Sequence, residues 1–236
     1  AALTRAVMRS AQTLGAHLYM PATFIGAQLH ENSCSVTYQH NGPTHICETT
    51  VLVNAAGRCA HRLLGHTPPA PTRRAADLVQ GTHLVVTGNI THGIYYVEAP
   101  QDQRAVFVMP WQGNTLVGTT ETVYQGDPAA VRPLPQEQEY LTQTLAHYFP
   151  VYRNQPMILS AFAGLRVLPA GEGRAFSRPR ETVLHVDREE RPRLLTVYGG
   201  KLTAYRLTAA RVMQRLVSAL PSRTARADTR TLILSA

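Results

Sequence analysis

One lysine stands at a position where it could act on an anion. Lys201 follows Gly199 and Gly200 and is the only lysine among 23 basic residues. The apolar run 194–198 predicts a strand before this turn, and the amphipathic pattern after it predicts a helix, an arrangement that points backbone N–H groups toward an anion. Because arginine does not replace the compact ammonium one for one, the position indicates a site. The alternative is a lone lysine placed there by chance.

An arginine on an apolar strand is the second candidate. Arg166 lies within the apolar run 164–168, and a buried guanidinium needs an anionic partner. That partner is either a carboxylate of the protein or a substrate phosphate. Arg178 and Arg180 follow on either side of a proline, and several guanidinium groups suit phosphate because each can form paired hydrogen bonds. For Arg178, a solvated basic turn is an equal alternative.

A histidine and a run of small residues complete the set. His83 lies in a predicted strand and could take a proton or bind substrate, although it is one of ten histidines and most lone histidines are structural. Residues 51–57 form an apolar run that ends in small residues. Small residues let a ligand approach the backbone closely, whereas an ordinary strand-to-helix turn is the alternative.

The composition limits the kinds of protein that this chain can be. The chain has 236 residues, of which 44% are hydrophobic and 16% charged, which is typical of one large or two small globular domains. The net charge is +8 without a block of like charges, so it permits an anionic substrate, an acidic partner or an anionic membrane surface. Three cysteines without CxxC spacing argue against a disulfide framework or a metal site and fit a reducing, cytoplasmic compartment.

Elements that would hold these residues can be predicted in order. Helical periodicity covers residues 3–14, and strand patterns follow at 17–20, 24–30, 33–40 and 46–53, with Asn41 and Gly42 as a hairpin turn. Three prolines between 65 and 71 mark a boundary. Beyond it, short β-rich segments predict an antiparallel sheet with a helix over 135–149. We therefore expect one domain of discontinuous segments, residues 1–75 and 190–236, interrupted by a second domain, residues 76–189.

Several short motifs acquire meaning from their order. They are residues 53–57, 81–86, 107–111, 118–121, 124–128, 164–168 and 199–206. Together they resemble the FAD-dependent glycerol-3-phosphate dehydrogenase family, within the wider group of glycine oxidase and D-amino-acid oxidase-like flavoproteins. The sequence departs from the family at Arg58 and Cys59, where Pro-Trp is usual.

The resemblance implies a mixed α/β and α+β fold: part of a FAD-binding α/β domain interrupted by an antiparallel β-sheet substrate domain with flanking helices. It implies FAD as the cofactor. The glycine fingerprint for the FAD pyrophosphate does not occur in this sequence, so the chain is expected to be an internal fragment. Whether it holds FAD by itself is left open.

The resemblance also implies roles for single residues. Arg166 would bind the substrate, and Arg180, preferred over Arg178, would meet its phosphate. His83 would contact the glycerol end and take the hydroxyl proton, and Lys201 would lie near flavin and substrate. The expected catalytic residues are therefore His83, Lys201 and Arg166, with no metal. The expected cofactor contacts are Asn54, Ala55, Gly57, Gly199, Gly200, Lys201, Leu202 and Thr203.

The reaction implied is oxidation of sn-glycerol 3-phosphate to dihydroxyacetone phosphate, with electrons passed to a quinone or another acceptor. A cytoplasmic enzyme is expected, with peripheral contact at the cytoplasmic membrane as an open possibility. One alternative is a related flavoprotein that oxidises another hydroxy acid or an amino acid. Another is a basic binding module, which only the net charge supports; a nucleic-acid partner is not expected.

Overall fold

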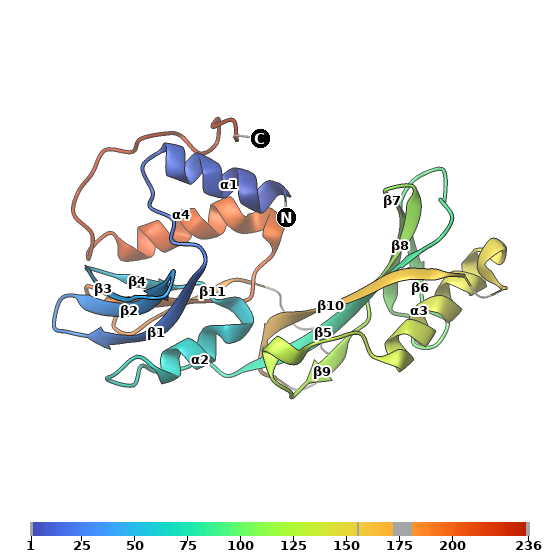
Figure 1. Ribbon diagram of the computed structural model, residues 1–236, viewed down its shortest axis with the longest axis horizontal. Coiled ribbons are helices and arrows are strands. Elements are labelled where there is room, and N and C mark those ends of the chain that lie inside the picture. The colour runs from blue at the N-terminus through green and yellow to red at the C-terminus, as the bar shows by residue number, and fades with distance from the viewer. Residues whose placement is uncertain (1, 155, 172–180, 235–236) are drawn as a thin grey trace. The chain divides into compact units, whose positions relative to one another are not determined.

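The fold was analysed in a computed structural model that describes residues 2–154, 156–171 and 181–234. The chain divides into two compact units (Figure 1): Ala1–Arg74 with Glu181–Ala236, and Ala75–Arg180. The first unit resumes earlier than residue 190, where the sequence analysis placed the boundary. The reason is strand β11 (Val183–Val186), which pairs antiparallel with β12 (Leu194–Tyr198) and so belongs to the first unit.

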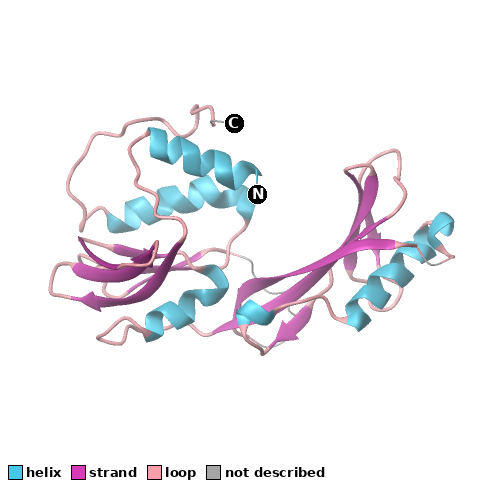
Figure 2. Cartoon of the chain, viewed as in Figure 1, coloured by secondary structure: helices cyan, strands magenta, loops and turns pink. Residues whose placement is uncertain are grey.

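The first unit contains a three-stranded antiparallel sheet (Figure 2). Helix α1 (Ala2–Thr13) precedes β1 (Ala22–Leu29), β2 (Cys34–His40) and β3 (Thr44–Thr49), which pair in that order. Asn41 and Gly42 connect β2 to β3 with φ of 51° and 106°, the left-handed conformation that this dipeptide favours. The prediction of a strand over residues 17–20 is wrong. The first strand begins only after Pro21, whose missing N–H cannot join a ladder.

A second small sheet in this unit holds a parallel pair. Its order is β11-β12-β4, and β4 (Leu52–Asn54) runs parallel to β12. The strand predicted through residues 46–53 is therefore interrupted, since β3 ends at Thr49 and β4 begins in a different sheet. β4 is also less covered than its apolar sequence indicated, because the side chain of Val53 is 40% exposed.

The second sheet of the first unit packs on both sides. On one side Leu216 of α4 (Tyr205–Leu216) packs with Val186 and Leu195. Elsewhere in this unit Leu194 packs with Leu64 of α2 (Ala60–Gly65) and with residues of β1 and β2. Because neighbouring residues of a strand point to opposite faces, Leu194 and Leu195 bring the sheet into contact with two different hydrophobic clusters.

The second unit is an antiparallel sheet covered by one long helix. Its strands are β5 (Ala76–Val86), β6 (Tyr95–Glu98), β7 (Ala105–Trp111), β8 (Asn114–Gly118), β9 (Thr122–Tyr124) and β10 (Ile158–Pro169). They pair in the order β10-β5-β8-β7-β6, with β9 also on β5. Helix α3 (Pro135–Tyr148) packs Leu141 and Leu145 against Leu84 and Val117. This confirms the antiparallel sheet and helix that the sequence predicted here.

Short 3₁₀ turns connect several elements. They are η1 (Gly57–Cys59), η2 (Pro128–Ala130), η3 (Pro150–Tyr152) and η5 (Leu202–Ala204). Within the described ranges, no helix is long and apolar enough to cross a bilayer.

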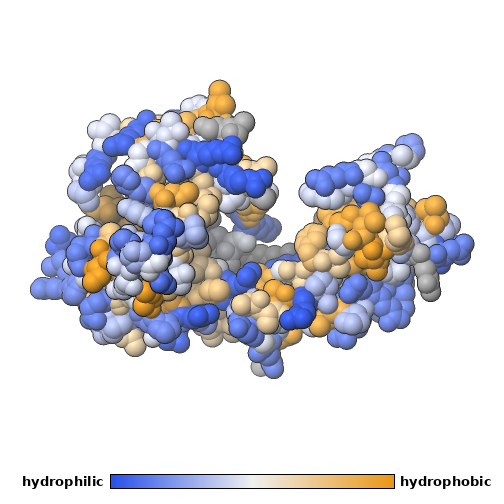
Figure 3. Space-filling view, in the orientation of Figure 1, coloured by the Kyte–Doolittle hydropathy of each residue, from blue (hydrophilic) through white to orange (hydrophobic). Residues whose placement is uncertain are grey.

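The face of the second sheet that points away from α3 is called the site face below. Gln80, Thr82 and Leu84 of β5 point to the α3 side, where they contact Glu137 or the core. Alternation along the strand then places Gly81 and His83 on the site face. The surface of this unit carries apolar patches (Figure 3). Phe107 and Phe162 are among its exposed apolar side chains.

Candidate active site

A buried carboxylate organises the strands beneath the site. Glu137 of α3 is 3% exposed. Its Oε2 accepts hydrogen bonds from Gln80 Nε2 (2.6 Å), Thr82 Oγ1 (2.6 Å) and the backbone N–H of Leu134 (3.1 Å). Its Oε1 accepts from Thr120 Oγ1 (2.8 Å) and Thr122 Oγ1 (2.9 Å).

These donors decide the charge of the group. Burial by itself raises the pKa of Glu137, but the hydrogen bonds from Thr82, Leu134, Thr120 and Gln80 outweigh it and hold the pKa below its ordinary value. The carboxylate is therefore ionised at neutral pH and fully hydrogen-bonded, which is the condition under which a buried charge is tolerated.

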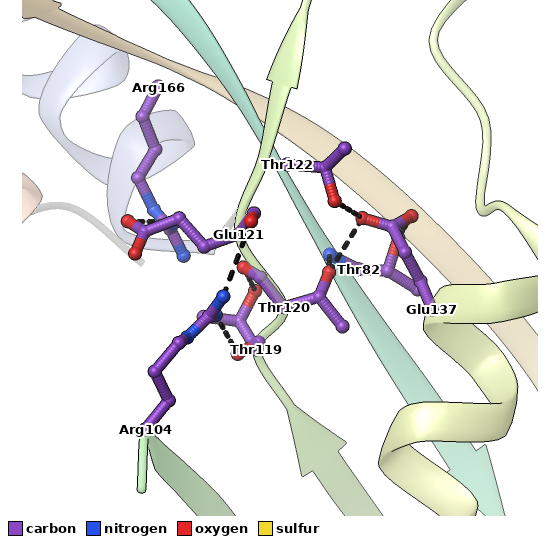
Figure 4. Close-up of polar contacts among 8 residues, drawn as sticks. All are labelled: Thr82, Arg104, Thr119, Thr120, Glu121, Thr122, Glu137 and Arg166. Carbon is purple, nitrogen blue, oxygen red and sulfur yellow. Dashed lines mark hydrogen bonds and ion pairs between the residues drawn. The ribbon is translucent and has the colours of Figure 1, made fainter. Parts of the chain in front are cut away.

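The segment after β8 presents alternate side chains to opposite faces. Thr120 and Thr122 point to Glu137, so the intervening Glu121 points to the other side (Figure 4). Arg104 fixes the main chain here, because Nη2 donates to the carbonyl of Thr119 (3.2 Å) and Nη1 to that of Glu121 (3.3 Å). The position of the Glu121 carboxylate is thus set by contacts on both sides of the strand.

Arg166 of β10 meets this carboxylate. Its Nη1 lies 3.4 Å from Glu121 Oε1, with side-chain exposures of 26% for Arg166 and 5% for Glu121. The guanidinium passes over Gly81: a Cβ there would lie 2.8 Å from Arg166 Nη2 and 2.5 Å from Thr119 Oγ1. Of the two partners expected for Arg166, the carboxylate of the protein is therefore present, and the Arg166 side chain remains partly exposed.

His83 lies on the same face as Arg166. Its ring stacks on Phe162 with centroids 5.1 Å apart and an interplanar angle of 7°, and it covers Gly118, where an added Cβ would collide with the imidazole. Burial, and then the positive charge of Arg166, lower the pKa of His83. A neutral imidazole at pH 7 can accept a proton from a substrate hydroxyl.

Two of the predicted substrate residues are therefore brought together. Across β5 and β10, His83 pairs with Phe162, Gly81 with Gly164, and Val79 with Arg166. Sequence reasoning missed Glu121 and Phe162, whose signals were the Thr-Thr-Glu-Thr alternation and an aromatic residue four positions before the arginine. Arg178 and Arg180 lie outside the described residues.

In the first unit the two predicted cofactor segments meet at one sheet edge. Asn54 ends β4, Gly199 follows β12, and these strands are parallel neighbours with Thr196 opposite Asn54. Asn54 is 1% exposed; its Nδ2 donates to the carbonyl of Ala60 (3.0 Å) and its Oδ1 accepts from the N–H of Ala56 (3.2 Å). Asn54 thus shapes the turn.

The residues beside this turn expose backbone. Ala55 and Gly57 are exposed, and a Cβ at Gly57, where φ is 54°, would meet no atom of the described residues within 4 Å. Backbone that is uncovered at the carboxyl ends of adjacent parallel strands is where open α/β sheets bind ligands.

The glycine turn differs from its prediction in one respect. Gly199 and Gly200 adopt φ of 67° and 96°, and a Cβ at Gly200 would lie 2.6 Å from Thr182 Oγ1. The predicted helix does not begin at Lys201. That residue is extended (φ −119°, ψ 143°) and precedes η5, and α4 begins only at Tyr205. Lys201, Leu202 and Thr203 are exposed.

Comparison with known proteins identifies the family. The family model described as FAD dependent oxidoreductase (DAO) matches residues 1–206. The chain belongs to this FAD-dependent oxidoreductase family. The resemblance drawn from the ordered motifs is confirmed at this level, and FAD is the cofactor of the family.

Within this flavoprotein family, the chain is similar to polyol-phosphate dehydrogenases. It is 31% identical over 212 residues to a glycerol-3-phosphate dehydrogenase of Pseudomonas aeruginosa, covering 88% of this chain and 41% of the relative. It is 30% identical over 182 residues to a D-erythritol 1-phosphate dehydrogenase of Brucella abortus, covering 76% of this chain and 36% of the relative. The chain therefore spans well under half the length of these relatives.

Solved structures agree on the fold. A glycerol-3-phosphate dehydrogenase from Bacillus halodurans complexed with FAD aligns with a TM-score of 0.76 and 26% identity, covering 91% of this chain and 42% of that one. A glycine oxidase from Bacillus cereus aligns with a TM-score of 0.63 at 17% identity, covering 92% of this chain and 55% of the other. The second likeness concerns the fold alone.

The residues of the first unit fit a flavin nucleotide. The positive-φ glycines Gly57 and Gly199 are exposed and leave the backbone at the strand ends without side chains, so a planar or phosphate-bearing group can approach closely. Gly200 instead makes room for Thr182, which packs against it. Asn54 is fully engaged within its turn and so would act on the cofactor by shaping the loop.

Proposed function

We propose that the protein carrying this chain oxidises a polyol phosphate, with sn-glycerol 3-phosphate as the first candidate and a four-carbon analogue such as D-erythritol 1-phosphate as the second. The product from glycerol 3-phosphate would be dihydroxyacetone phosphate. The observation that carries the proposal is that one face of one sheet holds both the neutral imidazole of His83 and the partly exposed side chain of Arg166. The similarity to two polyol-phosphate dehydrogenases supports it.

Each side chain has a part in this proposal. Arg166 binds the phosphate through paired hydrogen bonds, and Arg180 adds a second positive charge. Glu121 holds the guanidinium in place, so a bound phosphate shares Arg166 with the Glu121 carboxylate. His83 binds the hydroxyl of the carbon that is oxidised and accepts its proton at an imidazole nitrogen.

FAD, when bound, supplies the oxidising power by accepting a hydride from that carbon. We propose that the first unit holds it through Asn54, Ala55, Gly57, Gly199, Gly200, Leu202 and Thr203, and that the second unit holds the substrate. Lys201 adds a positive charge beside both. Electrons then pass to a quinone or another acceptor, in the cytoplasm or at the surface of its membrane.

Steady-state turnover of the complete FAD-loaded protein tests the proposal. Glycerol 3-phosphate should be oxidised. Arg166→Ala should raise its KM by about 100-fold, since a charged hydrogen-bonded contact is worth about 1.5–3 kcal/mol or more when paired. Arg153→Ala, an exposed arginine of the same unit, is the matched control and should change nothing. An unchanged KM in Arg166→Ala would show that Arg166 does not bind the substrate phosphate.

A second candidate substrate is a carboxylate. Arg166 pairs with the carboxylate of Glu121, so its fork can receive that group as well as a phosphate. A related flavoprotein activity on a hydroxy acid or an amino acid would follow. Turnover of 2-hydroxyglutarate or glycine in preference to glycerol 3-phosphate would favour this alternative.

A further inference from the structure

Two glycines face each other on the site face. Gly81 of β5 pairs with Gly164 of β10. On one side of them lies the pair of His83 and Phe162, and on the other lies Arg166. Same-face neighbours along a strand lie about 6.7 Å apart. The glycine pair therefore forms a stretch without side chains between the pair of His83 with Phe162 and the pair of Val79 with Arg166.

The two glycines differ in what covers them. The guanidinium of Arg166 fills the space above Gly81, so a methyl group there would collide with it. Above Gly164 an added Cβ meets no atom of the described residues within 4 Å. Gly164 is exposed, and the space above it is open to a ligand.

The fold itself does not require glycine at this position. Its φ is outside the left-handed region, and a methyl group would fit without contact. Glycine in the middle of a strand costs about 0.5–1 kcal/mol relative to alanine. Within the second unit, nothing that the structure describes offsets this cost, whereas a ligand lying over the bare peptide would.

We propose that Gly164 is a specificity-determining residue: its bare peptide, which follows Phe162 and precedes Arg166 on the site face and lies diagonal to His83, receives the carbon chain of the substrate. The absence of a side chain there sets how long a chain fits. This inference rests on the proposed function and deepens it. With its phosphate on Arg166 and its reacting hydroxyl on His83, a longer chain needs more room than a three-carbon chain does. Because the guanidinium fills the space above Gly81, the neighbouring open space is the one above Gly164, and the longer chain would use it.

Alanine at this position would therefore discriminate by length. One methylene group in a closely fitting site changes kcat/KM by about 10–200-fold. Gly164→Ala should lower kcat/KM for D-erythritol 1-phosphate at least tenfold more than for glycerol 3-phosphate, mainly through KM. Inhibition by inorganic phosphate should be unchanged, because Arg166 is untouched.

The experiment uses the complete FAD-loaded protein with wild type, Gly164→Ala and Gly171→Ala. Gly171 lies in the same unit just after β10, and a Cβ there also meets no atom of the described residues within 4 Å, so Gly171→Ala is the matched control and should behave as wild type. The melting temperature of Gly164→Ala should equal or exceed that of wild type. Glycerol 3-phosphate and D-erythritol 1-phosphate are each assayed for turnover and, by thermal shift, for binding.

The outcomes separate the two ideas. Equal effects of Gly164→Ala on both phosphates, or no effect on either, overturn the role of Gly164 while leaving the function standing. If wild type binds both polyol phosphates but oxidises neither, the proposed function fails. The inference is then decided by binding: Gly164→Ala should raise the dissociation constant of D-erythritol 1-phosphate at least tenfold more than that of glycerol 3-phosphate. If wild type neither binds nor oxidises either phosphate, both ideas fail.

Discussion

Replacing Glu137 with glutamine should destabilise the second unit by about 3 kcal/mol, although it changes only one atom. Glu137 accepts hydrogen bonds on both carboxylate oxygens from five donors and is almost fully buried. An amide has one accepting oxygen, and its nitrogen can only donate. Some donors must therefore lose their partner or turn away.

The size of the loss follows from which donors can adapt. Gln80 Nε2 and the Leu134 N–H cannot accept a hydrogen bond, so the amide oxygen of the glutamine has to take the position of Oε2 and face them. The amide nitrogen then faces the hydroxyls of Thr120 and Thr122, which can rotate to accept. The retained bonds lose their charge assistance, roughly half their strength. With a net value of about 1.5–3 kcal/mol for each bond to a charged group, the sum of these losses, less what rotation recovers, is about 3 kcal/mol.

Trp111 provides the assay. It is the only tryptophan and lies in β7 of the second unit, so its emission during urea unfolding reports on this unit. Glu139→Gln makes the same chemical change two residues later on α3, at an exposed position, and should alter stability by less than about 0.5 kcal/mol. Equal midpoints for the two variants would refute the reasoning.

The dependence on pH gives a second check. The pKa of Glu137 is lower in the folded chain than its ordinary value of 4.5. Its stabilising contribution is therefore fully present above that value and is lost as pH falls through the lower, folded-state pKa. The difference between wild type and Glu137→Gln should accordingly shrink below pH 4.5.

Three further outcomes are expected. Gly81→Ala should displace the Arg166 guanidinium and weaken binding of both polyol phosphates about equally, at least tenfold, in contrast to Gly164→Ala. The inhibition constant of inorganic phosphate, which reports on Arg166, should rise as well. An unchanged inhibition constant contradicts this prediction. Phe162→Ala should admit water to His83, relieve the burial that lowers its pKa, and move the acid limb of kcat/KM to higher pH. A limb that stays in place or moves lower argues against His83 as the base. Asn54→Ala should leave a backbone donor and acceptor without partners and destabilise the first unit by about 2 kcal/mol, with loss of FAD on gel filtration; retention of FAD at wild-type stability would be the contrary result.

Local patterns predicted much of the second unit because its signals are short-range. Alternating apolar residues and turn dipeptides identified the strands around His83, and helical spacing with a proline at the start identified α3. The hairpin at Asn41 followed from residues that tolerate positive φ. Errors arose where one local pattern was compatible with two structures. The run before Asn54 is divided between two strands that lie in different sheets, and Lys201 is extended, so that α4 begins only at Tyr205.

By itself, the sequence determined the order of elements, the residue types available for chemistry and, through the ordered motifs, the family. Only the tertiary structure decided which of these residues meet. Glu121 and Arg166 are 45 residues apart and come together because of the register of strands around β5. Asn54 and Gly199 lie near each other because β4 and β12 are parallel neighbours from distant parts of the chain. A strand's own residues specify its faces but not its partner or register, and on those depend the ion pair, the open space above Gly164 and the sheet edge that can receive a cofactor.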